Sequence, residues 1–551
     1  MKKGILAVSI VLIVCIVIGV LLCSGLIGKV SGIVNAEDYG LVKNDINAAA
    51  KNTKALNRLI KSAVSSTKIN FSNGTYYFAA DYLGGIKINN KKNISLCGDN
   101  TVFVNTTFSP LDVKTTNYNK SNILHLSKSQ DITISGITFD YAAHTNVCGE
   151  VIKSDNTGTY FKVYDLFLAG ENAAEGGETV TRVNIFSKDN APINEVWFDE
   201  AVGKKLETTE TKNVFKINGF KANKGEKVCA VFSSGTYSCP TIYVEHTSGL
   251  SFYNVTVNSS PSAVLYAPIG NADFSFDAFN VLPKSDENLF ASNSDCIHIK
   301  SLGGNLSLKN CNFSFIGDDA LNIHCIAAKI TKKKSEDNSI TLQLASAGIS
   351  MPSGWASVGD EIEFFDFALN SIATAKVKKV KKDTLILDNI PQGVNAGAYV
   401  QNISKSPTVL LENCTVDTGR ARGILIQTKN VTVKNCTFKN LSLAGVLVAP
   451  DLTNWYELGP TDNLLIENCR FVNCNIRQPN ADFGAITVAL GHDGDAVKNS
   501  KFVHKNILIE NNTFENCFAN AVYATNVGGI KIQANQFNGH KVVLNKCEEI
   551  K

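Results

Sequence analysis

The sequence predicts an all-β chain: a right-handed parallel β-helix (solenoid) with two inserted small β-barrel or sandwich domains and an N-terminal capping helix. Three observations support this fold class. A strand–corner–strand unit recurs along the chain, uninterrupted units start 22 or 23 residues apart, and two long stretches interrupt the series. One coil per two dozen residues, with alternating apolar positions inside each strand, is typical of a parallel β-helix.

The repeated unit carries an Asn at its corner, and in most copies a Cys follows that Asn. Clear copies occupy residues 305–313, 408–416, 430–438, 463–471, 506–514 and 529–537. Of the 15 cysteines, Cys15 and Cys23 lie in the apolar N-terminal run, which leaves 13 beyond it. Because most Asn-Cys pairs share one phase of the repeat, we expect these cysteines to be buried thiols stacked inside the solenoid.

The first 36 residues read as a targeting segment, either a signal peptide or a signal anchor. Lys2 and Lys3 precede an apolar run over residues 5–27, which is long enough to cross a bilayer. A small-residue ending at Ala36 offers a cleavage site. Both alternatives imply export, so we expect the protein to be secreted or held at the cell surface by residues 5–27.

The remaining chain divides into coils and insertions. A helical pattern from Asp45 to Ala63 would cap the first coil and cover its open edge. Two stretches hold Gly-bounded strands without the Asn corner, and we interpret them as small β domains. The expected division is N-terminal coils with the capping helix over 37–148, a first inserted domain over 149–235, central coils over 236–325, a second inserted domain over 326–405, and C-terminal coils over 406–551.

Composition excludes some classes of function. The chain is 44% apolar, which is incompatible with a disordered protein. It has 53 basic and 50 acidic residues, so nucleic acid is not an expected partner. No CxxC pair and no Cys/His cluster with zinc spacing occurs, so we expect neither a metal site nor a cofactor.

The repeat register brings distant acidic residues together. Equivalent positions on adjacent coils lie about 4.8 Å apart, because that is the spacing of paired strands. Alignment of the apolar positions places Asp295, Asp319 and Arg422 in one row, with Asp318 beside it. These residues start their strands, where a corner resets the alternation, so we expect the carboxylates to face outward into a cleft. On the outward face, His298 stacks on Asn322.

Paired carboxylates suit glycoside hydrolysis. Like charges in contact raise one pKa, so the pair supplies an acid and a base at the same pH. A diagonal offset between coils gives the carboxyl separation of about 6.5–9.5 Å that leaves room for a water and predicts inversion. Two alternatives remain open. A single Asp here often only completes a corner, and carboxylates also bind calcium, although Arg422 disfavours a cation in this row.

A family resemblance appears at these residues. The Asn-Ser-Asp ending at Asp295 and the Gly-Asp-Asp ending at Asp319 resemble paired motifs of polygalacturonases, but the Gly-His-Gly and Arg-Ile-Lys motifs of those enzymes are missing. The chain is more similar to glycoside hydrolase family 110, the exo-acting α-1,3-galactosidases. That likeness also rests on residues 422–426 and 454–460 and on the two insertions.

The resemblance implies a catalytic group of Asp295, Asp318 and Asp319. Analogy with polygalacturonases suggests Asp318 as general acid, with Asp295 and Asp319 holding the attacking water. Further polar and aromatic residues are candidates for binding the sugar, through ring packing or hydrogen bonds: His298, Asn322, His324, Arg422, Trp455, Tyr456 and Glu457.

The sequence therefore predicts an inverting exo-glycoside hydrolase that releases terminal α-1,3-linked galactose from glycans or oligosaccharides, with a carbohydrate substrate and no cofactor. One alternative is another polysaccharide depolymerase on the same scaffold, either a hydrolase of uronic acid chains or a lyase. A second alternative is a surface adhesin without catalytic activity.

Overall fold

The computed structural model describes residues 28–79, 85–106, 122–142, 144–164, 179–189, 204–232, 240–285, 287, 289–344, 351–452, 455–479, 482–491 and 499–550. Residues 1–27, which carry the predicted targeting and membrane segment, lie outside this range. Within it, no helix is both long and apolar enough to span a bilayer. Ile33–Asn35 form strand β1, which pairs with β2 (Thr67–Phe71), so cleavage after Ala36 would remove a strand of the solenoid.

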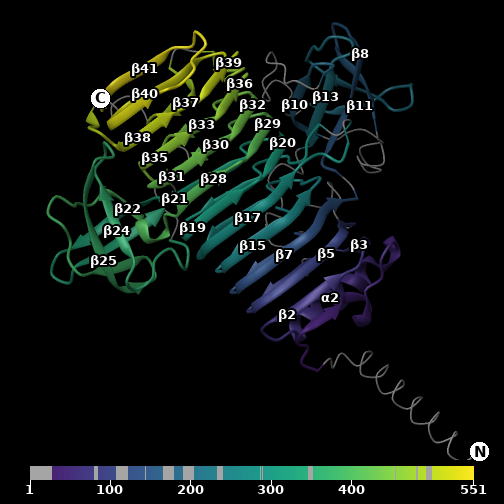
Figure 1. Ribbon diagram of the computed structural model, residues 1–551, viewed down its shortest axis with the longest axis horizontal. Helices are drawn as coiled ribbons and strands as arrows, with labels where there is room; N and C mark the ends of the chain where they lie inside the picture. The colour runs from purple at the N-terminus through teal and green to yellow at the C-terminus, as the bar shows by residue number, and fades with distance from the viewer. Residues whose placement is uncertain are drawn as a thin grey trace, which may run out of the picture.

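The main body is a 29-stranded sheet wound into coils (Figure 1). Its N-terminal strands are β1, β2, β3 (Gly74–Phe78), β4 (Ile86–Asn89), β5 (Lys92–Asn105), β6 (Leu124–Ser127) and β7 (Gln130–Tyr141). Its central strands are β14 (Ile242–Glu245), β15 (Ser248–Val257), β16 (Leu265–Ile269), β17 (Asn271–Val281), β18 (Ile297–Lys300), β19 (Leu302–Lys309), β20 (Asn312–Ile316) and β21 (Leu321–Ile326).

The C-terminal coils continue the same ladder after a long interruption. Their strands are β28 (Thr408–Glu412), β29 (Thr415–Gly419), β30 (Ile424–Ile426), β31 (Asn430–Lys434), β32 (Thr437–Leu441), β33 (Val446–Val448), β34 (Glu457–Leu458), β35 (Asp462–Glu467), β36 (Arg470–Val472), β37 (Gly484–Val488), β38 (His504–Glu510), β39 (Thr513–Glu515), β40 (Asn520–Gln533) and β41 (Val542–Glu549). The predicted β-helix fold is confirmed.

Two further β units project from the coils. A six-stranded sheet contains β8 (Asn146–Ser154), β9 (Gly158–Val163), β10 (Val180–Phe186), β11 (Leu206–Thr208), β12 (Val214–Asn218) and β13 (Lys227–Phe232). A closed barrel contains β22 (Ala328–Lys334), β23 (Ser339–Leu344), β24 (Glu361–Phe365), β25 (Ser371–Lys381), β26 (Thr384–Leu387) and β27 (Tyr399–Asn402). In Figure 1 the barrel strands lie at lower left and the six-stranded sheet at upper right. The exact domain boundaries stay a prediction.

The helix α2 (Ala49–Ser62) covers the first coils, as the sequence pattern predicts. Its buried residues recur every three or four positions, so one apolar face packs on the solenoid. Two short 3-10 helices precede it, at Ala36–Tyr39 and Ile46–Ala48, and a third occupies Ile403–Lys405.

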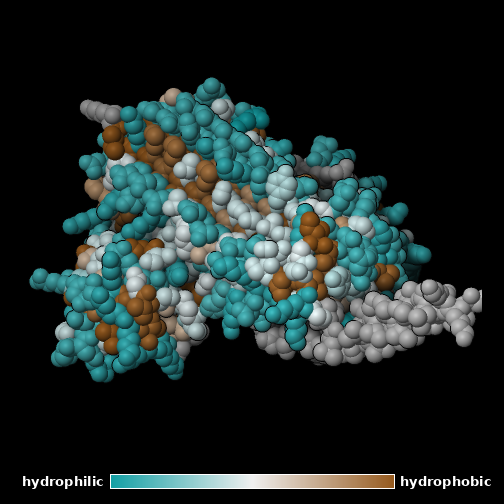
Figure 2. Space-filling model, turned by 60° about the horizontal axis from the view of Figure 1, so that its bottom comes forward, coloured by the Kyte–Doolittle hydropathy of each residue, from teal (hydrophilic) through white to brown (hydrophobic). Residues whose placement is uncertain are grey.

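The interior is built from ladders of identical residues. Phe438, Phe471, Phe514 and Phe537 stack with ring centroids 5.2, 5.1 and 5.7 Å apart. The Cys residues of the repeated corners are buried free thiols, as expected. The face of the molecule in Figure 2 is mainly hydrophilic and is broken by separate apolar patches.

The Asn corners have a conformational cause. Corner residues such as Asn413, Asn435 and Asn468 adopt positive φ angles of 57°, 56° and 53°. Gly adopts this left-handed backbone most easily, and among the residues that carry a side chain Asn is one of the most tolerant of it. The Asn435 side-chain amide also donates to the Asn413 side-chain oxygen at 3.2 Å, and Asn413 donates in the same way to Asn310 at 3.3 Å, so these corners are tied to those on the preceding coils.

Candidate active site

The row of Asp295, Asp319 and Arg422 exists in the structure. β18 pairs with β21 and β21 pairs with β30 in parallel, with Ile297 opposite Leu321 and Leu321 opposite Ile424. The residues two positions earlier therefore align, as the repeat register predicts.

Each carboxylate in the row accepts the backbone N–H of the next coil. The Asp319 amide donates to Asp295 Oδ1 at 3.1 Å, and the Arg422 amide donates to Asp319 Oδ1 at 3.0 Å. These bonds fix both side chains at the strand entrance, where they line a cavity.

Arg422 holds Asp319 by its guanidinium as well. Nε donates to Oδ1 and Nη2 donates to Oδ2, both at 2.7 Å, which is a bidentate pair. Burial raises the pKa of Asp319 to about 6, and the nearby Asp318 and Asp295 charges act in the same direction, whereas Arg422 opposes them. The guanidinium of Arg422 therefore mainly binds Asp319, and the residue also lines the cavity.

Asp295 is the second buried carboxyl, 6% exposed. Burial raises its pKa to about 7, and the adjacent Asp318 charge contributes further. Its Oδ2 lies 2.9 Å from His298 Nδ1. A proton therefore resides on this small group of side chains close to neutral pH.

Asp318 is the most accessible of the three. Its side chain is 23% exposed, and its Oδ1 lies 3.4 Å from Arg420 Nη1. Arg420 also donates to the Gly317 carbonyl at 3.0 Å. Gly317 has no room for a Cβ, because Arg182 and the Asn293 backbone occupy that position. The Gly-Asp-Asp motif thus needs its glycine for close packing.

The two histidines contact each other instead of open solvent. His298 Nε2 lies 3.2 Å from His324 Nε2, and His324 Nε2 lies 3.4 Å from Glu457 Oε1. His324 is buried and does not line the cavity, whereas His298, Asn322 and Glu457 do. Asn322 faces His298 across the strand pair, as expected.

The segment from Trp455 to Glu457 is split between two roles. Trp455 is 71% exposed and borders the cavity. Tyr456 instead packs in an apolar cluster with barrel residues Phe365 and Leu369 and with Leu458. β34 pairs antiparallel with the end of β21, and this pairing turns Glu457 into the site. The structure thus places Tyr456 outside the cavity.

The cavity measures about 440 Å³, within the usual range for small-molecule sites. It includes residues that the sequence reasoning did not assign: Pro240, Ser262, Ala263, Tyr266, Ser294, Lys300, Leu425, Leu447, Ala449, Asp451 and Gly491. The repeat register of the sequence itself places Lys300 next to His324, and it could also have revealed Tyr266, which faces His298 on the preceding strand. Arg420 and Gln427, which hold Asp318 and Glu457, carried no such signal.

Two groups among the described residues bring three possible metal ligands within 4.8 Å of one another. They are Asp295, Asp318 and Asp319, and His298, His324 and Glu457. In the first group Arg422 already supplies a cation, and in the second the ligand atoms contact one another. We assign neither group to a metal.

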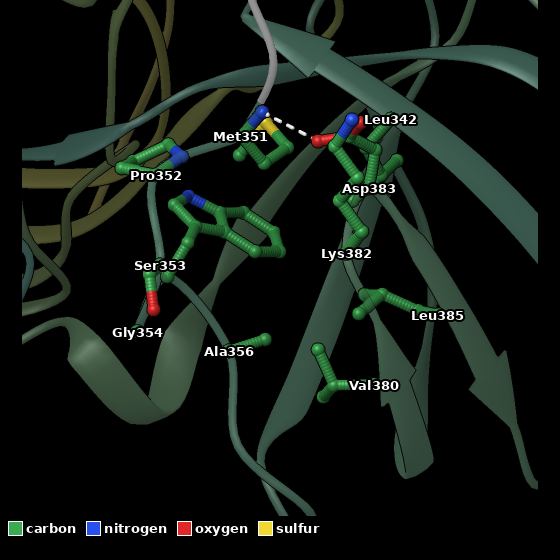
Figure 3. Close-up of a pocket in the computed structure, with 11 residues that line it drawn as sticks. Leu342, Met351, Pro352, Ser353, Gly354, Ala356, Val380, Lys382, Asp383 and Leu385 are labelled. Carbon is green, nitrogen blue, oxygen red and sulfur yellow. Dashed lines mark hydrogen bonds between the residues drawn. The ribbon is translucent and has the colours of Figure 1, made fainter.

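A second cavity, of about 290 Å³, lies in the barrel (Figure 3). Leu342, Met351, Pro352, Val380 and Leu385 give it a largely apolar lining. Its Asp383 accepts the Met351 backbone N–H at 2.9 Å. In the part of the barrel cavity's lining that the structure describes, Asp383 is the one acidic residue, and it binds a loop backbone. That lining therefore has no group of converging carboxylates like that of the first cavity.

A family model described as the right handed beta helix region matches residues 395–547. Among curated proteins, the chain is 27% identical over 277 residues to alpha-1,3-galactosidase B of Bacteroides thetaiotaomicron, covering 48% of this chain and 44% of the relative. It is 24% identical over 423 residues to alpha-1,3-galactosidase B of Parabacteroides distasonis, covering 73% and 66%. It is 27% identical over 268 residues to alpha-1,3-galactosidase A of Akkermansia muciniphila, covering 47% and 43%.

The matched segments thus span between 43% and 66% of the length of these relatives. The resemblance to glycoside hydrolase family 110 that the motifs predict is confirmed, and the chain is a right-handed β-helix protein similar to proteins named α-1,3-galactosidases.

Proposed function

We propose that this protein is an exo-acting glycoside hydrolase that releases terminal α-1,3-linked galactose with inversion of configuration. The observation that carries the proposal is the convergence of Asp295, Asp318 and Asp319 on one cavity, with Arg422 bound to Asp319. The similarity to proteins named α-1,3-galactosidases supports the choice of galactose.

Asp318 is the general acid in this proposal. It is the most exposed of the three carboxyls, so it can reach the glycosidic oxygen of a sugar seated in the cavity. Its proton goes to that oxygen as the bond to the anomeric carbon breaks. Asp319 stays ionised beside the oxocarbenium-like transition state, because the Arg422 guanidinium donates two hydrogen bonds to its carboxylate.

Asp295 and Asp319 position the attacking water. One oxygen of each of the three carboxylates lies within 4.8 Å of the others, which is closer than the separation expected from the sequence. A single water that donates two hydrogen bonds of about 2.8 Å joins acceptors ~4.4 Å apart. The short distance therefore suits two carboxylates that share one water, and the proposed inversion rests on that shared water.

Proton NMR during hydrolysis of α-1,3-, α-1,4- and α-1,6-linked galactobiose tests the proposal. We expect β-galactose to appear first, and only from the α-1,3 isomer. Asp318→Asn and Asp319→Asn should lower kcat/KM by at least about 100-fold. Asp417→Asn is the matched control, because Asp417 pairs with Lys439 on a neighbouring coil outside the cavity. Initial α-galactose would contradict inversion, and no release from any isomer would contradict the activity.

One observation favours a second candidate, a hydrolase or lyase of uronic acid chains. Lys300 borders the cavity, with its ammonium 5.6 Å from the centre of the Tyr266 ring, and a cation there suits an acidic sugar. Incubation with polygalacturonate distinguishes this candidate: new reducing ends indicate a hydrolase, and an unsaturated product that absorbs in the ultraviolet indicates a lyase. If the Asp variants keep glycan binding and no substrate is cleaved, the protein is an adhesin.

A further inference from the structure

A continuous chain of side chains leads away from Asp295. Asp295 Oδ2 lies 2.9 Å from His298 Nδ1, His298 Nε2 lies 3.2 Å from His324 Nε2, and His324 Nε2 lies 3.4 Å from Glu457 Oε1. The remaining polar atoms of His324 and Glu457 also have partners. His324 Nδ1 lies 3.2 Å from the Cys325 carbonyl oxygen, and Gln427 donates to Glu457 Oε2 at 3.0 Å.

The Cys325 carbonyl determines where the protons are. A carbonyl oxygen only accepts, so His324 Nδ1 carries a hydrogen, and in the neutral ring Nε2 is then an acceptor. His298 Nε2 must therefore donate to it. This leaves His298 Nδ1 as an acceptor that faces an Asp295 oxygen, and two acceptors at 2.9 Å need a proton between them. With both rings neutral, Asp295 holds that proton.

We infer that Asp295, His298, His324 and Glu457 form a proton relay that takes up the proton of the attacking water and moves it away from the reacting sugar. The inference rests on the proposed hydrolysis and names Asp295 as the group that accepts the proton. Asp319 is the poorer acceptor, because the guanidinium of Arg422 stabilises its charged form.

The transfer is balanced at every atom. In the form that reacts, Asp295 is ionised and Asp318 carries the proton that it gives to the glycosidic oxygen. During attack, the water O–H bond breaks, the oxygen bonds the anomeric carbon, and the proton joins Asp295. That proton passes to His298 Nδ1 while the proton on His298 Nε2 passes to His324 Nε2. Burial lowers the pKa of His324, so the proton that reaches its Nε2 passes on to Glu457 Oε1, 3.4 Å away, and Asp295 is a carboxylate again. After product release the same steps reverse, and the proton leaves from Asp295 to water in the cavity.

The benefit is electrostatic. A carboxylate beside a positively charged transition state stabilises it, and a protonated Asp295 would not. The charged groups around the relay are Lys300, Asp318, Asp319 and Arg422, in addition to Glu457. Burial lowers the pKa of His298 to about 3, and Lys300 also disfavours its charge, so the ring is neutral at rest. Burial raises the pKa of Glu457, which lets it share the proton that reaches His324.

The tautomers of the two rings give a test that does not depend on activity. In protein labelled with ¹⁵N-histidine, two-dimensional spectra of the imidazole nitrogens report which nitrogen carries hydrogen. His298→Gln and His324→Gln assign the signals. We expect His324 to be protonated at Nδ1 and His298 at Nε2 at the acidic end of the pH range over which the fold persists. A His298 ring protonated at Nδ1 throughout that range would overturn the relay, whether or not the protein hydrolyses galactosides.

The pH dependence of kcat then tests the relay in catalysis. His324→Gln keeps hydrogen-bonding capacity but cannot carry a proton, so we expect kcat to fall roughly 10- to 100-fold with KM unchanged and the acidic limb of the profile, which reports protonation of the accepting group, to move. Glu457→Gln should move the same limb. The control is His125→Gln. His125 lies outside the cavity, on a coil that precedes those of the candidate site, and its Nε2 is 3.5 Å from Glu245 Oε1. An unchanged pH profile in His324→Gln, with galactose still released, would refute the relay and leave the proposed function standing.

Discussion

Ionisation of the buried Asp295 lowers the stability of the fold, although the proposed reaction needs this carboxyl ionised. It is buried with its pKa raised to about 7, whereas in an unfolded chain an Asp titrates near 3.9. The folded state therefore binds the proton more tightly than the unfolded state. Stability from this group is complete below pH ~4 and is lost as the pH rises through about 7. The raised pKa of Asp295 therefore costs stability at neutral pH and above.

Asp295→Asn tests this cost, because Asn resembles the protonated acid in shape and can still donate to His298. We expect the variant to gain stability relative to the wild type as pH rises from 4 to 8, by at most about 1.4 kcal/mol per pH unit. Urea unfolding at several pH values measures it. A stability difference that does not change with pH would contradict the raised pKa. Activity should be lost at every pH.

At the level of single residues, register predicted more than side-chain direction did. Asp295, Asp319 and Arg422 lie side by side because the parallel register of β18, β21 and β30 aligns these positions. By contrast, Tyr456 was expected at the sugar and lies in an apolar cluster with the barrel. The sequence could not show this, because it depends on contact between two segments that no repeat relates.

Among the elements, the Asn corners combine a backbone and a side-chain contribution. Substitution of Asn435 separates them. Asn435→Gly keeps the positive φ but loses the bond to Asn413, so we expect a loss of about 0.5–1.5 kcal/mol. Asn435→Ala also strains the backbone, which adds about 1–2 kcal/mol. Chemical denaturation of both variants measures the difference. Equal losses would mean that the left-handed backbone contributes nothing at this corner.

The elements were the most predictable level of this molecule. The capping helix, the coils and the two insertions all follow from periodicity that local sequence carries. The arrangement inside each insertion was not predictable, because neither repeats. The sequence did not distinguish a closed barrel from another small sheet. The structure has one closed barrel and one six-stranded sheet, whose outer strands β10 and β11 meet at a single bridge between Thr179 and Lys205.

At the scale of the whole molecule, the six-stranded sheet contacts the loop that precedes Asp295. Arg182 on β10 is buried and donates to the backbone carbonyl of Asn293, two residues before Asp295. Asn146 on β8 donates to the Asn293 side chain at 2.8 Å. The first inserted sheet thus fixes the loop that carries Asp295, one of the carboxylates of the candidate site.

Arg182→Met should therefore lower kcat more than it raises KM, because it loosens Asn293 and leaves the cavity wall intact. Steady-state kinetics on α-1,3-galactobiose, together with a thermal unfolding curve, measures both effects. The matched control is Lys216→Met on β12, whose ammonium pairs with Glu207 inside the same sheet. If both variants lose the same activity, the sheet acts only through overall stability.

The barrel has a different relation to the coils. β19 pairs in register with β28, from Asn305 opposite Thr408 onward, although the whole barrel lies between them in the chain. The solenoid thus closes across the gap as if the intervening residues were absent. Exchange of that segment between relatives would change the apolar surface on which Tyr456 packs, next to Trp455, and would leave the three aspartates of the candidate site in place. In the proposed hydrolase, glycan preference can therefore change by recombination at two junctions, with the three acids unaltered.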